Sequence, residues 1–273
     1  MTLSPQSSKD APRRSATGPA KGPATQEPLK KSRGGGVRLG GVTLAASPRT
    51  AGVIVEGRVQ SAAKKALRDG ADILELRADT FPDASAGAMR TVIMGLKSLG
   101  KPVLLTIRSR KEGGVHQIPD RERAKLYTAL IPLADAVDIE LGSSAILKDV
   151  VGSAKDNNKK VIISYHNFKT TPGNGRLQDI IARAREKGAD IVKIAAFARS
   201  PQDLKRLASL LAGQDDLIVI AMGERGKASR VFFPMLGSLL TYGSVTASTA
   251  PGQMTLREIK RELKKYGFGG GAG

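Results

Sequence analysis

Eight short apolar runs, separated by segments with a helical pattern, most constrain what this chain can fold into. The runs are AGVIVEG from Ala51, ADILEL from Ala71, KPVLLTI from Lys101, DAVDIEL from Asp135, KKVIISY from Lys159, ADIVKIA from Ala189, DLIVIAM from Asp216 and LTYGSV from Leu240. Strands that alternate with helices in this number predict an α/β fold, a (β/α)8 TIM barrel. A doubly wound open sheet is the alternative, but its first strand would lead into a Gly-rich dinucleotide turn, and VEGRVQS is not one.

Helix signals occur where the barrel requires helices. Ser200 can cap a helix that has Pro201 at its first position. Thr255 and Glu258 have the spacing of a capping box, and a Gly follows the helix that they begin. Residues 176–187 form a third predicted helix, with apolar side chains on one face. Those side chains belong to Leu177, Ile180, Ile181 and Ala184.

Composition divides the chain into three parts. Residues 1–41 are rich in Pro, Ser, Gly, Lys and Arg and nearly lack large apolar side chains, so we expect a disordered basic extension. An organelle transit peptide is the alternative, although no amphipathic helix is visible. Residues 42–266 are the predicted catalytic barrel, and the Gly-rich residues 267–273 are a predicted flexible tail.

The net charge of +19 does not come from the extension alone, because residues 1–50 hold nine basic and two acidic residues of the 44 and 25 in the chain. Such a field attracts anionic small molecules and nucleic acids alike. With 4% aromatic residues and no Trp, stacking surfaces for bases are scarce, so we expect only non-specific nucleic-acid binding by the basic extension.

Several classes of chemistry are excluded by what the sequence lacks. It contains no Cys, so it has neither a disulfide framework nor a thiolate nucleophile, and its two His do not form a metal-ligand pattern. No apolar run reaches 18 residues, so no membrane-spanning helix is predicted. We therefore expect a cytoplasmic protein without a metal site.

One strand carries a charged residue in an unusual place. Strand residues alternate between faces, so Ile191, Lys193 and Ala195 share one face of their run. Burial of an ammonium group is costly. Lys193 therefore extends out of the strand end, is paired in the core, or serves as a nucleophile.

The same alternation places polar groups near the C-terminal ends of the neighbouring strands. The residues that share a face are Glu75 with Arg77, Thr106 with Arg108, Asp138 with Glu140, and Ser164 with His166. Structural ion pairs can account for one or two of these sets. Active sites of (β/α)8 enzymes lie at the C-terminal end of the barrel. We therefore expect His166 and Lys193 to face one cavity, although a core histidine with its hydrogen bonds satisfied is the alternative.

A buried lysine, a histidine, carboxylates and arginines together suit Schiff-base chemistry. The lysine attacks a carbonyl, and the resulting iminium draws electrons from the adjacent carbon. The histidine removes a proton from that carbon as a base and returns one to a leaving hydroxyl as an acid. An arginine would hold an anionic substrate. Carboxylates interleaved with Arg and Lys argue against a magnesium site.

Six motifs resemble those of one family. They are ELRAD from Glu75, TIRSRKEGG from Thr106, SYHNF from Ser164, IVKIA from Ile191, AMGERGKASR from Ala221 and TAPGQ from Thr249. Their order and intervals resemble the type I 3-dehydroquinate dehydratases over about residues 51–266. The resemblance implies a (β/α)8 lyase, often a homodimer, that needs neither metal nor cofactor. It would dehydrate 3-dehydroquinate to 3-dehydroshikimate through a lysine Schiff base, in the shikimate pathway of aromatic amino acid biosynthesis.

The resemblance also implies roles for nine residues. Lys193 would form the imine, His166 would act as acid and base, and Glu112 would pair with that histidine. Arg230 would bind the substrate carboxylate. The other substrate-binding residues would be Glu75, Arg77 and Arg108 around the hydroxyls, and Thr249 and Gln253 on a lid loop. Without the family, ion pairs at strand ends and a solvated loop charge would account equally well for Glu75, Arg77 and Glu112.

Two departures and two competing functions remain open. Many members have Ser in place of Thr249, and the first strand matches the family poorly, so we place no site residue there. We expect His116, on a loop, to be solvated or a minor lid residue. A Schiff-base aldolase on the same barrel is one rival function. An anion or nucleic-acid binder that uses the basic extension is the other.

Overall fold

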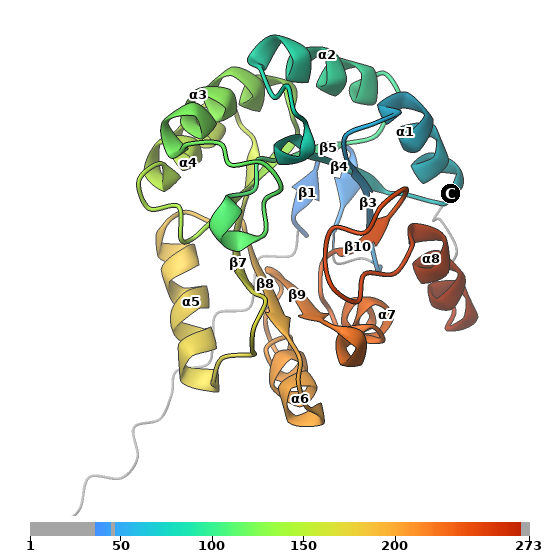
Figure 1. Cartoon of the computed structure of the whole chain (residues 1–273). Coiled ribbons are helices and arrows are strands. Elements are labelled where there is room, and N and C mark those ends of the chain that lie inside the picture. The colour runs from blue at the N-terminus through green and yellow to red at the C-terminus, as the bar shows by residue number, and fades with distance from the viewer. Residues whose placement is uncertain (1–35, 45–46, 269–273) are drawn as a thin grey trace, which may run out of the picture. The chain divides into compact units, whose positions relative to one another are not determined.

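Eight parallel strands surrounded by helices form the body of the protein (Figure 1). The structure is a computed structural model that describes residues 36–44 and 47–268. The strands pair in the order β10-β3-β4-β5-β6-β7-β8-β9. Their bounds are β3 Thr50–Ile54, β4 Ile73–Arg77, β5 Val103–Thr106, β6 Ala136–Glu140, β7 Lys160–Asn167, β8 Ile191–Phe197, β9 Leu217–Met222 and β10 Thr241–Ser244. Each strand overlaps one of the eight predicted runs, so the predicted barrel is confirmed.

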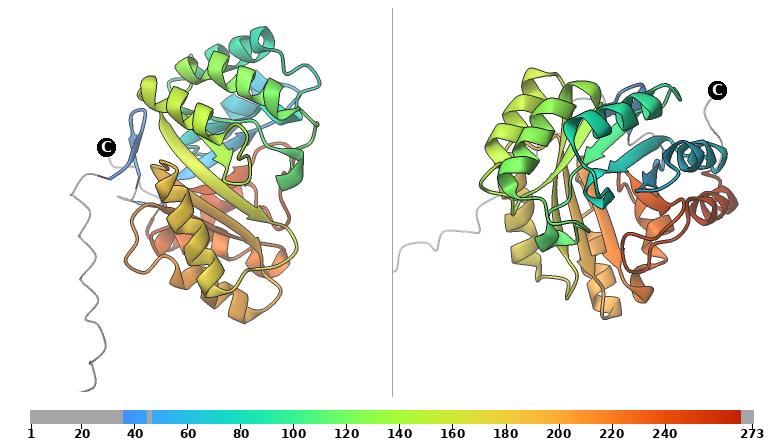
Figure 2. Two further views of the ribbon diagram at one scale, coloured as in Figure 1. Left: turned by 90° about the vertical axis from the view of Figure 1, so that its left-hand side faces the viewer. Right: turned by 45° about the horizontal axis from the view of Figure 1, so that its top comes forward.

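Helices connect successive strands and cover the outside of the sheet (Figure 2). The α-helices are α1 Val59–Arg68, α2 Ala86–Lys97, α3 Asp120–Leu130, α4 Leu147–Asp156, α5 Asn174–Glu186, α6 Pro201–Ser209, α7 Ser229–Met235 and α8 Leu256–Lys265. Four 3-10 turns interrupt the connections: η1 Ala78–Thr80, η2 Arg110–Glu112, η3 Ile131–Leu133 and η4 Glu224–Gly226. None of the described helices is long and apolar enough to cross a membrane.

The predicted helix ends are confirmed by hydrogen bonds. Ser200 caps α6 and exchanges bonds with Asp203 in a capping box. Thr255 and Glu258 do the same for α8. At the end of α8, Gly267 adopts φ +83°, a left-handed conformation that favours glycine. Gly267 and the next residue thus close the helix rather than begin the predicted tail, of which residues 269–273 lie outside the described residues.

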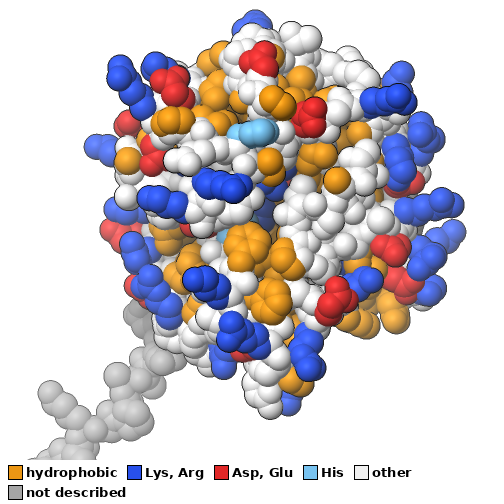
Figure 3. All heavy atoms as spheres, in the orientation of Figure 1, with side chains coloured by type: hydrophobic (Ala, Val, Ile, Leu, Met, Phe, Trp, Pro, Cys, Tyr) orange, Lys and Arg blue, Asp and Glu red, His pale blue; other side chains and the backbone are white. Residues whose placement is uncertain are grey.

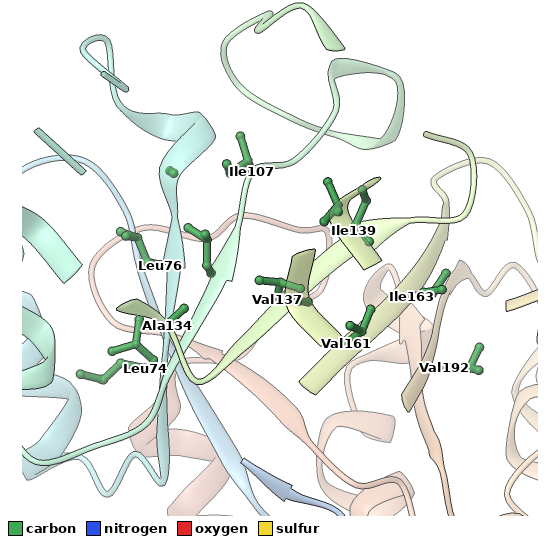
Figure 4. Close-up of a cluster of buried hydrophobic side chains, with 14 of the residues drawn as sticks. Leu74, Leu76, Ile107, Ala134, Val137, Ile139, Val161, Ile163 and Val192 are labelled. Carbon is green, nitrogen blue, oxygen red and sulfur yellow. The ribbon is translucent and has the colours of Figure 1, made fainter. Parts of the chain in front are cut away.

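Alternating strand residues build two cores. One face of each strand packs against the helices, where the side chains of Leu74, Val137, Ile163 and others form a continuous cluster (Figure 4). The opposite face points into the barrel, where Ile162, Ile191 and other side chains form a second cluster. This second set of side chains fills the barrel below its C-terminal end, where the active sites of such barrels lie.

The barrel closes between β9 and β10 without a regular ladder. Among the described residues, the main chain of Leu239 donates to Leu217 O at 2.9 Å. The hydroxyl of Ser238 accepts the N–H of Val219 at 2.9 Å. A buried serine side chain therefore replaces one backbone partner at this seam.

A small hairpin corrects the predicted boundary of the extension. β1 Arg38–Leu39 and β2 Val42–Thr43 pair antiparallel, at one end of the barrel in the left view of Figure 2. Leu39 and Leu44 are fully buried in the inner cluster with residues that begin the strands, so they cover the N-terminal end of the barrel. The boundary at residue 41 is therefore wrong, because residues 38–41 belong to this hairpin and Leu39 is buried in the barrel. Residues 1–35 of the predicted extension lie outside the described residues.

Candidate active site

A cavity opens at the C-terminal ends of the strands. All nine residues predicted from the sequence line it. They are Glu75, Arg77, Arg108, Glu112, His166, Lys193, Arg230, Thr249 and Gln253. Figure 3 shows Lys and Arg side chains inside the hollow near the centre of this face. Four cationic side chains and two carboxylates line the cavity, an excess of positive charge that suits an anionic small molecule.

Lys193 extends from β8 into the barrel and is almost completely buried. Its Nζ lies 2.9 Å from Oδ2 of Asp138 and 4.0 Å from the ring centroid of Tyr242. The lysine is therefore paired in the core and also faces the cavity. The first sequence alternative, in which the side chain leaves the strand end for solvent, is wrong.

Asp138 on β6 is the centre of a buried ionic network. Arg108 lies 2.9 Å from Oδ1 of Asp138 and 3.0 Å from Oε1 of Glu140, and it donates to the hydroxyl of Ser164 at 2.8 Å. Burial raises the pKa of Asp138, but the charges of Arg108 and Lys193 outweigh this effect and hold that pKa well below its usual range. Asp138 is therefore an ionised partner for a cationic nitrogen at Lys193.

A side chain from the helix layer supports this network. Arg123 on α3 reaches Glu140 through the outer wall of the barrel and is 1% exposed. It also donates to the main-chain oxygen of Ile107, the hydroxyl of Ser143 and the carboxylate of Asp120, each at 3.0 Å. Glu140 is thus held between two arginines, which fixes its carboxylate and, through it, Arg108.

His166 at the end of β7 pairs with Glu112 on η2. Oε2 of Glu112 lies 3.0 Å from Nδ1 of His166 and also accepts the main-chain N–H of His166 at 2.9 Å. An oxygen that already accepts the main-chain proton suits a ring that donates its Nδ1 proton. This assignment leaves Nε2 as the basic nitrogen.

Burial shifts both members of this pair. Burial raises the pKa of Glu112 to about 7, against the charge of Arg108. Burial and the charges of Arg108 and Lys193 hold the pKa of His166 well below its usual value. A neutral imidazole is the form that can remove a proton. The pair is therefore prepared as a base once Glu112 has ionised.

Two further predicted residues are fixed on β4. Glu75 accepts a hydrogen bond from Thr106 at 2.9 Å. Arg77 makes a two-pronged contact with Asp79, with both N–O distances 2.8 Å. Asp79 also accepts the main-chain N–H of Arg108 at 3.1 Å. The ion-pair interpretation of Arg77 is thus correct, and the pairing holds its guanidinium at the cavity wall.

Arg230 on α7 differs from the other arginines of the cavity. It is 3% exposed, yet its Nε and one terminal nitrogen have no hydrogen-bond partner among the described residues. Burial lowers its pKa to about 10. A buried guanidinium without an acceptor is unfavourable, and a carboxylate in the cavity would supply two acceptor oxygens.

The predicted lid loop follows β10 and carries Thr249 and Gln253. The side-chain oxygen of Gln253 accepts the main-chain N–H of Thr249 at 2.7 Å. The main-chain N–H of Gly223 donates to Pro251 O at 3.1 Å, so the loop rests on the turn after β9. Gly252 adopts φ +67°, and a Cβ there would lie 2.2 Å from Gly223 O. The close approach of these two turns therefore requires glycine.

Sequence reasoning left other cavity residues without a role. Asp138 and Ser164 had been placed on the correct face by alternation, but no site role was assigned to them. These two side chains hydrogen-bond each other, whereas Tyr242, Phe168 and Met222 line the cavity. Alternation places Met222 on the face that it shares with Ile218 and Ile220, and the same argument would have found Tyr242 on its strand. His116 is exposed and lies outside the cavity lining.

The fold and the site together define a barrel enzyme with acid–base groups and an anion-binding cavity. The model of the type I 3-dehydroquinase family matches residues 56–267. The chain therefore belongs to the type I 3-dehydroquinases, which makes it a hydro-lyase.

Individual relatives agree with this assignment. The chain is 40% identical over 204 residues to the 3-dehydroquinate dehydratase of Aquifex aeolicus, which covers 74% of this chain and 91% of that protein. The crystal structure of the Geobacillus kaustophilus 3-dehydroquinate dehydratase superimposes with a TM-score of 0.80 at 27% identity, over 85% of this chain and 96% of that one. The type I enzyme from Clostridium difficile, solved with covalent modified comenic acid, gives a TM-score of 0.77 at 29% identity, over 84% and 97%.

Proposed function

We propose that this protein dehydrates 3-dehydroquinate to 3-dehydroshikimate through an imine on Lys193, in the shikimate pathway of aromatic amino acid biosynthesis. The observation that carries the proposal is the placement of Lys193 and His166 on adjacent strands of one cavity that also contains the unpaired Arg230. The names of the relatives support the substrate. The covalent ligand of the Clostridium difficile enzyme supports covalent chemistry in this family.

Imine formation uses the Lys193–Asp138 pair. His166 accepts one proton from Nζ of Lys193, which then attacks the substrate carbonyl carbon as an uncharged amine. That proton returns from the imidazolium and a second passes from the nitrogen, so the carbonyl oxygen leaves as water. The product is an iminium, which keeps one positive charge on nitrogen. Asp138 lies 2.9 Å from Nζ and stabilises that charge without moving. The buried wall around Lys193 strengthens this interaction, because little water reaches it.

Elimination uses His166. Its Nε2 removes a proton from the carbon next to the iminium, and the electron pair moves toward the imine nitrogen. The imidazolium then protonates the leaving hydroxyl, so a second water departs and the iminium is restored in conjugation with the new double bond. Glu112 stabilises the imidazolium through Nδ1. Hydrolysis of the imine returns Lys193 and releases the product.

The remaining residues would orient the substrate. Arg230 would pair with its carboxylate, and Glu75, Arg77 and Arg108 would contact its hydroxyls. The lid loop would close over the ring with Thr249 and Gln253. The homodimer implied by the family resemblance stays a prediction.

The test is product formation from 3-dehydroquinate by the parent protein and by Lys193→Met. Turnover should be readily measured for the parent and should be lost in the variant, which keeps side-chain volume but has no amine. Activity toward aldol substrates instead of 3-dehydroquinate would favour the aldolase alternative. A protein without residues 1–35 should keep full turnover, since those residues precede the barrel. Loss of turnover on this deletion would contradict the assignment of the reaction to the barrel.

A further inference from the structure

Tyr242 lines the cavity but has no role in the steps described above. It lies on β10, and its side chain belongs to the inner cluster of the barrel with a residue exposure of 4%. Glu75 and Lys193 line the same cavity. The ring and the hydroxyl group each have a feature that the packing of the barrel does not explain.

The ring lies beneath the reacting nitrogen. Nζ of Lys193 is 4.0 Å from the ring centroid, a distance at which the electron-rich face attracts a cation. The nitrogen carries a positive charge during the reaction as an iminium. The same ring face can therefore contact the cation that the reaction forms.

The hydroxyl is buried and has no hydrogen-bond partner among the described residues. Two other tyrosines differ. The hydroxyl of Tyr127 donates to Asp138 O at 2.6 Å, and that of Tyr165 accepts the amide of Asn167 at 3.1 Å. Burial, together with the negative charges of Glu75 and Asp138, raises the pKa of Tyr242 well above its usual value, so its hydroxyl keeps its proton and remains a donor.

The position of the ring limits what this donor can reach. The substrate carbon that bonds to Nζ must come within one covalent bond of an atom that lies 4.0 Å above the ring centroid. Oxygens on that carbon or on its neighbour are then the ligand atoms closest to the tyrosine side chain. An orphaned donor in a cavity wall is satisfied when a ligand brings an acceptor to it.

We propose that Tyr242 is a further catalytic residue of this site. Its ring stabilises the cationic nitrogen of Lys193, and its hydroxyl donates a hydrogen bond to a substrate oxygen on or next to the imine carbon. The inference rests on the proposed function. It adds a residue that would contact the substrate near the carbon that reacts with Lys193, whereas Arg230 would bind the substrate carboxylate.

Four variants separate the two parts of the proposal. Tyr242→Phe removes only the hydroxyl, and Tyr242→Leu also removes the ring. Tyr165→Phe removes a tyrosine hydroxyl from outside the cavity, and Tyr127→Phe removes a buried hydroxyl that has partners. For each, kcat and KM with 3-dehydroquinate and the thermal midpoint of the ligand-free protein are measured.

The expected pattern differs between activity and stability. Tyr242→Phe should lower kcat/KM about tenfold, as loss of one hydrogen bond to the substrate implies. Its thermal midpoint should be unchanged or higher, because an orphaned hydroxyl has been removed. Tyr242→Leu should lower kcat/KM at least a further threefold. Tyr165→Phe should match the parent in activity, and Tyr127→Phe should have a lower thermal midpoint.

Several results would overturn the inference. If the parent is active and Tyr242→Phe has the same kcat/KM, the hydroxyl does not contact the substrate. Equal activity of the Phe and Leu variants shows that the ring does not act on the cation. A lower thermal midpoint for Tyr242→Phe shows that the hydroxyl has a partner within the protein. A parent without activity on 3-dehydroquinate instead overturns the proposed function, and the substrate contact with it.

Discussion

Replacement of Arg230 by methionine should make the ligand-free protein more stable while it destroys substrate binding. The guanidinium is buried, and two of its nitrogens have no acceptor among the described residues. Burial lowers its pKa from the usual value of an arginine to about 10. Such a difference corresponds to roughly 3 kcal/mol against the charged form in the folded state. Because the folded pKa is the lower one, this cost persists at every pH below about 10.

The assay is urea unfolding of the ligand-free protein at neutral pH. Arg230→Met replaces the guanidinium with an apolar side chain of similar length. Its free energy of unfolding should therefore rise by up to about 3 kcal/mol, less any packing energy that is lost. Arg77→Met is the matched buried control. It leaves Asp79 buried without its partner and should cost about 3 to 5 kcal/mol. Arg90→Met, at an exposed site on α2, should change stability by less than about 0.5 kcal/mol.

The kinetic measurement on the same variants completes this prediction. Arg230→Met should raise KM for 3-dehydroquinate about a hundredfold, since a buried carboxylate would lose its charged partner. A variant that is less stable than the parent would refute the argument, because it would mean that the guanidinium has a favourable partner in the free protein. An unchanged KM would show that the carboxylate binds elsewhere.

Three other predictions follow from single contacts. Since the pKa of Glu112 is raised to about 7, kcat/KM should rise as the pH passes through about 7 and this carboxylate ionises. Glu112→Gln should abolish that rise. The same pH profile in both proteins would contradict this prediction. Relative to the Glu112→Gln variant, the parent should also lose stability as the pH rises from about 4.5 to 7, because the unfolded chain ionises Glu112 more readily than the folded protein does. Gly252→Ala should displace the lid loop, because the added Cβ would lie 2.2 Å from Gly223 O. KM should therefore rise with little change in the thermal midpoint. Unchanged kinetics would show that the loop does not close on the substrate. Ser238→Ala should cost about 1 to 3 kcal/mol in urea unfolding, because the buried N–H of Val219 loses its partner at the barrel seam; a neutral result would show that the seam does not depend on this bond.

The strands and the location of the site could be predicted because both depend on local alternation. A period of two assigns every strand residue to one face, and parallel strands bring their C-terminal ends to one side of the barrel. This was enough to place Lys193 and His166 in one cavity. The roles of Glu112 and Arg230 came from the family resemblance, because a loop residue and a helix residue carry no such periodic signal.

Other features depend on contacts between distant parts of the chain. Arg123 lies on a helix whose pattern does not reveal that its guanidinium passes through the barrel wall to Glu140. The hairpin at Leu39 was missed because only two leucines anchor it within a Gly-rich stretch. The unpaired state of Arg230 and of the Tyr242 hydroxyl is visible only when all neighbouring partners are known. For these two groups, the lack of a hydrogen-bond partner, and not the residue type, indicates that they bind a ligand.

The most direct test of the central claim is borohydride trapping. The protein is incubated with 3-dehydroquinate, reduced and digested, and the peptides are analysed by mass spectrometry. The account predicts a substrate-dependent adduct on Lys193 in the parent and in Tyr242→Phe, and none in Lys193→Met. A folded, active protein that yields no adduct on Lys193, or an adduct on another lysine, would contradict the imine mechanism.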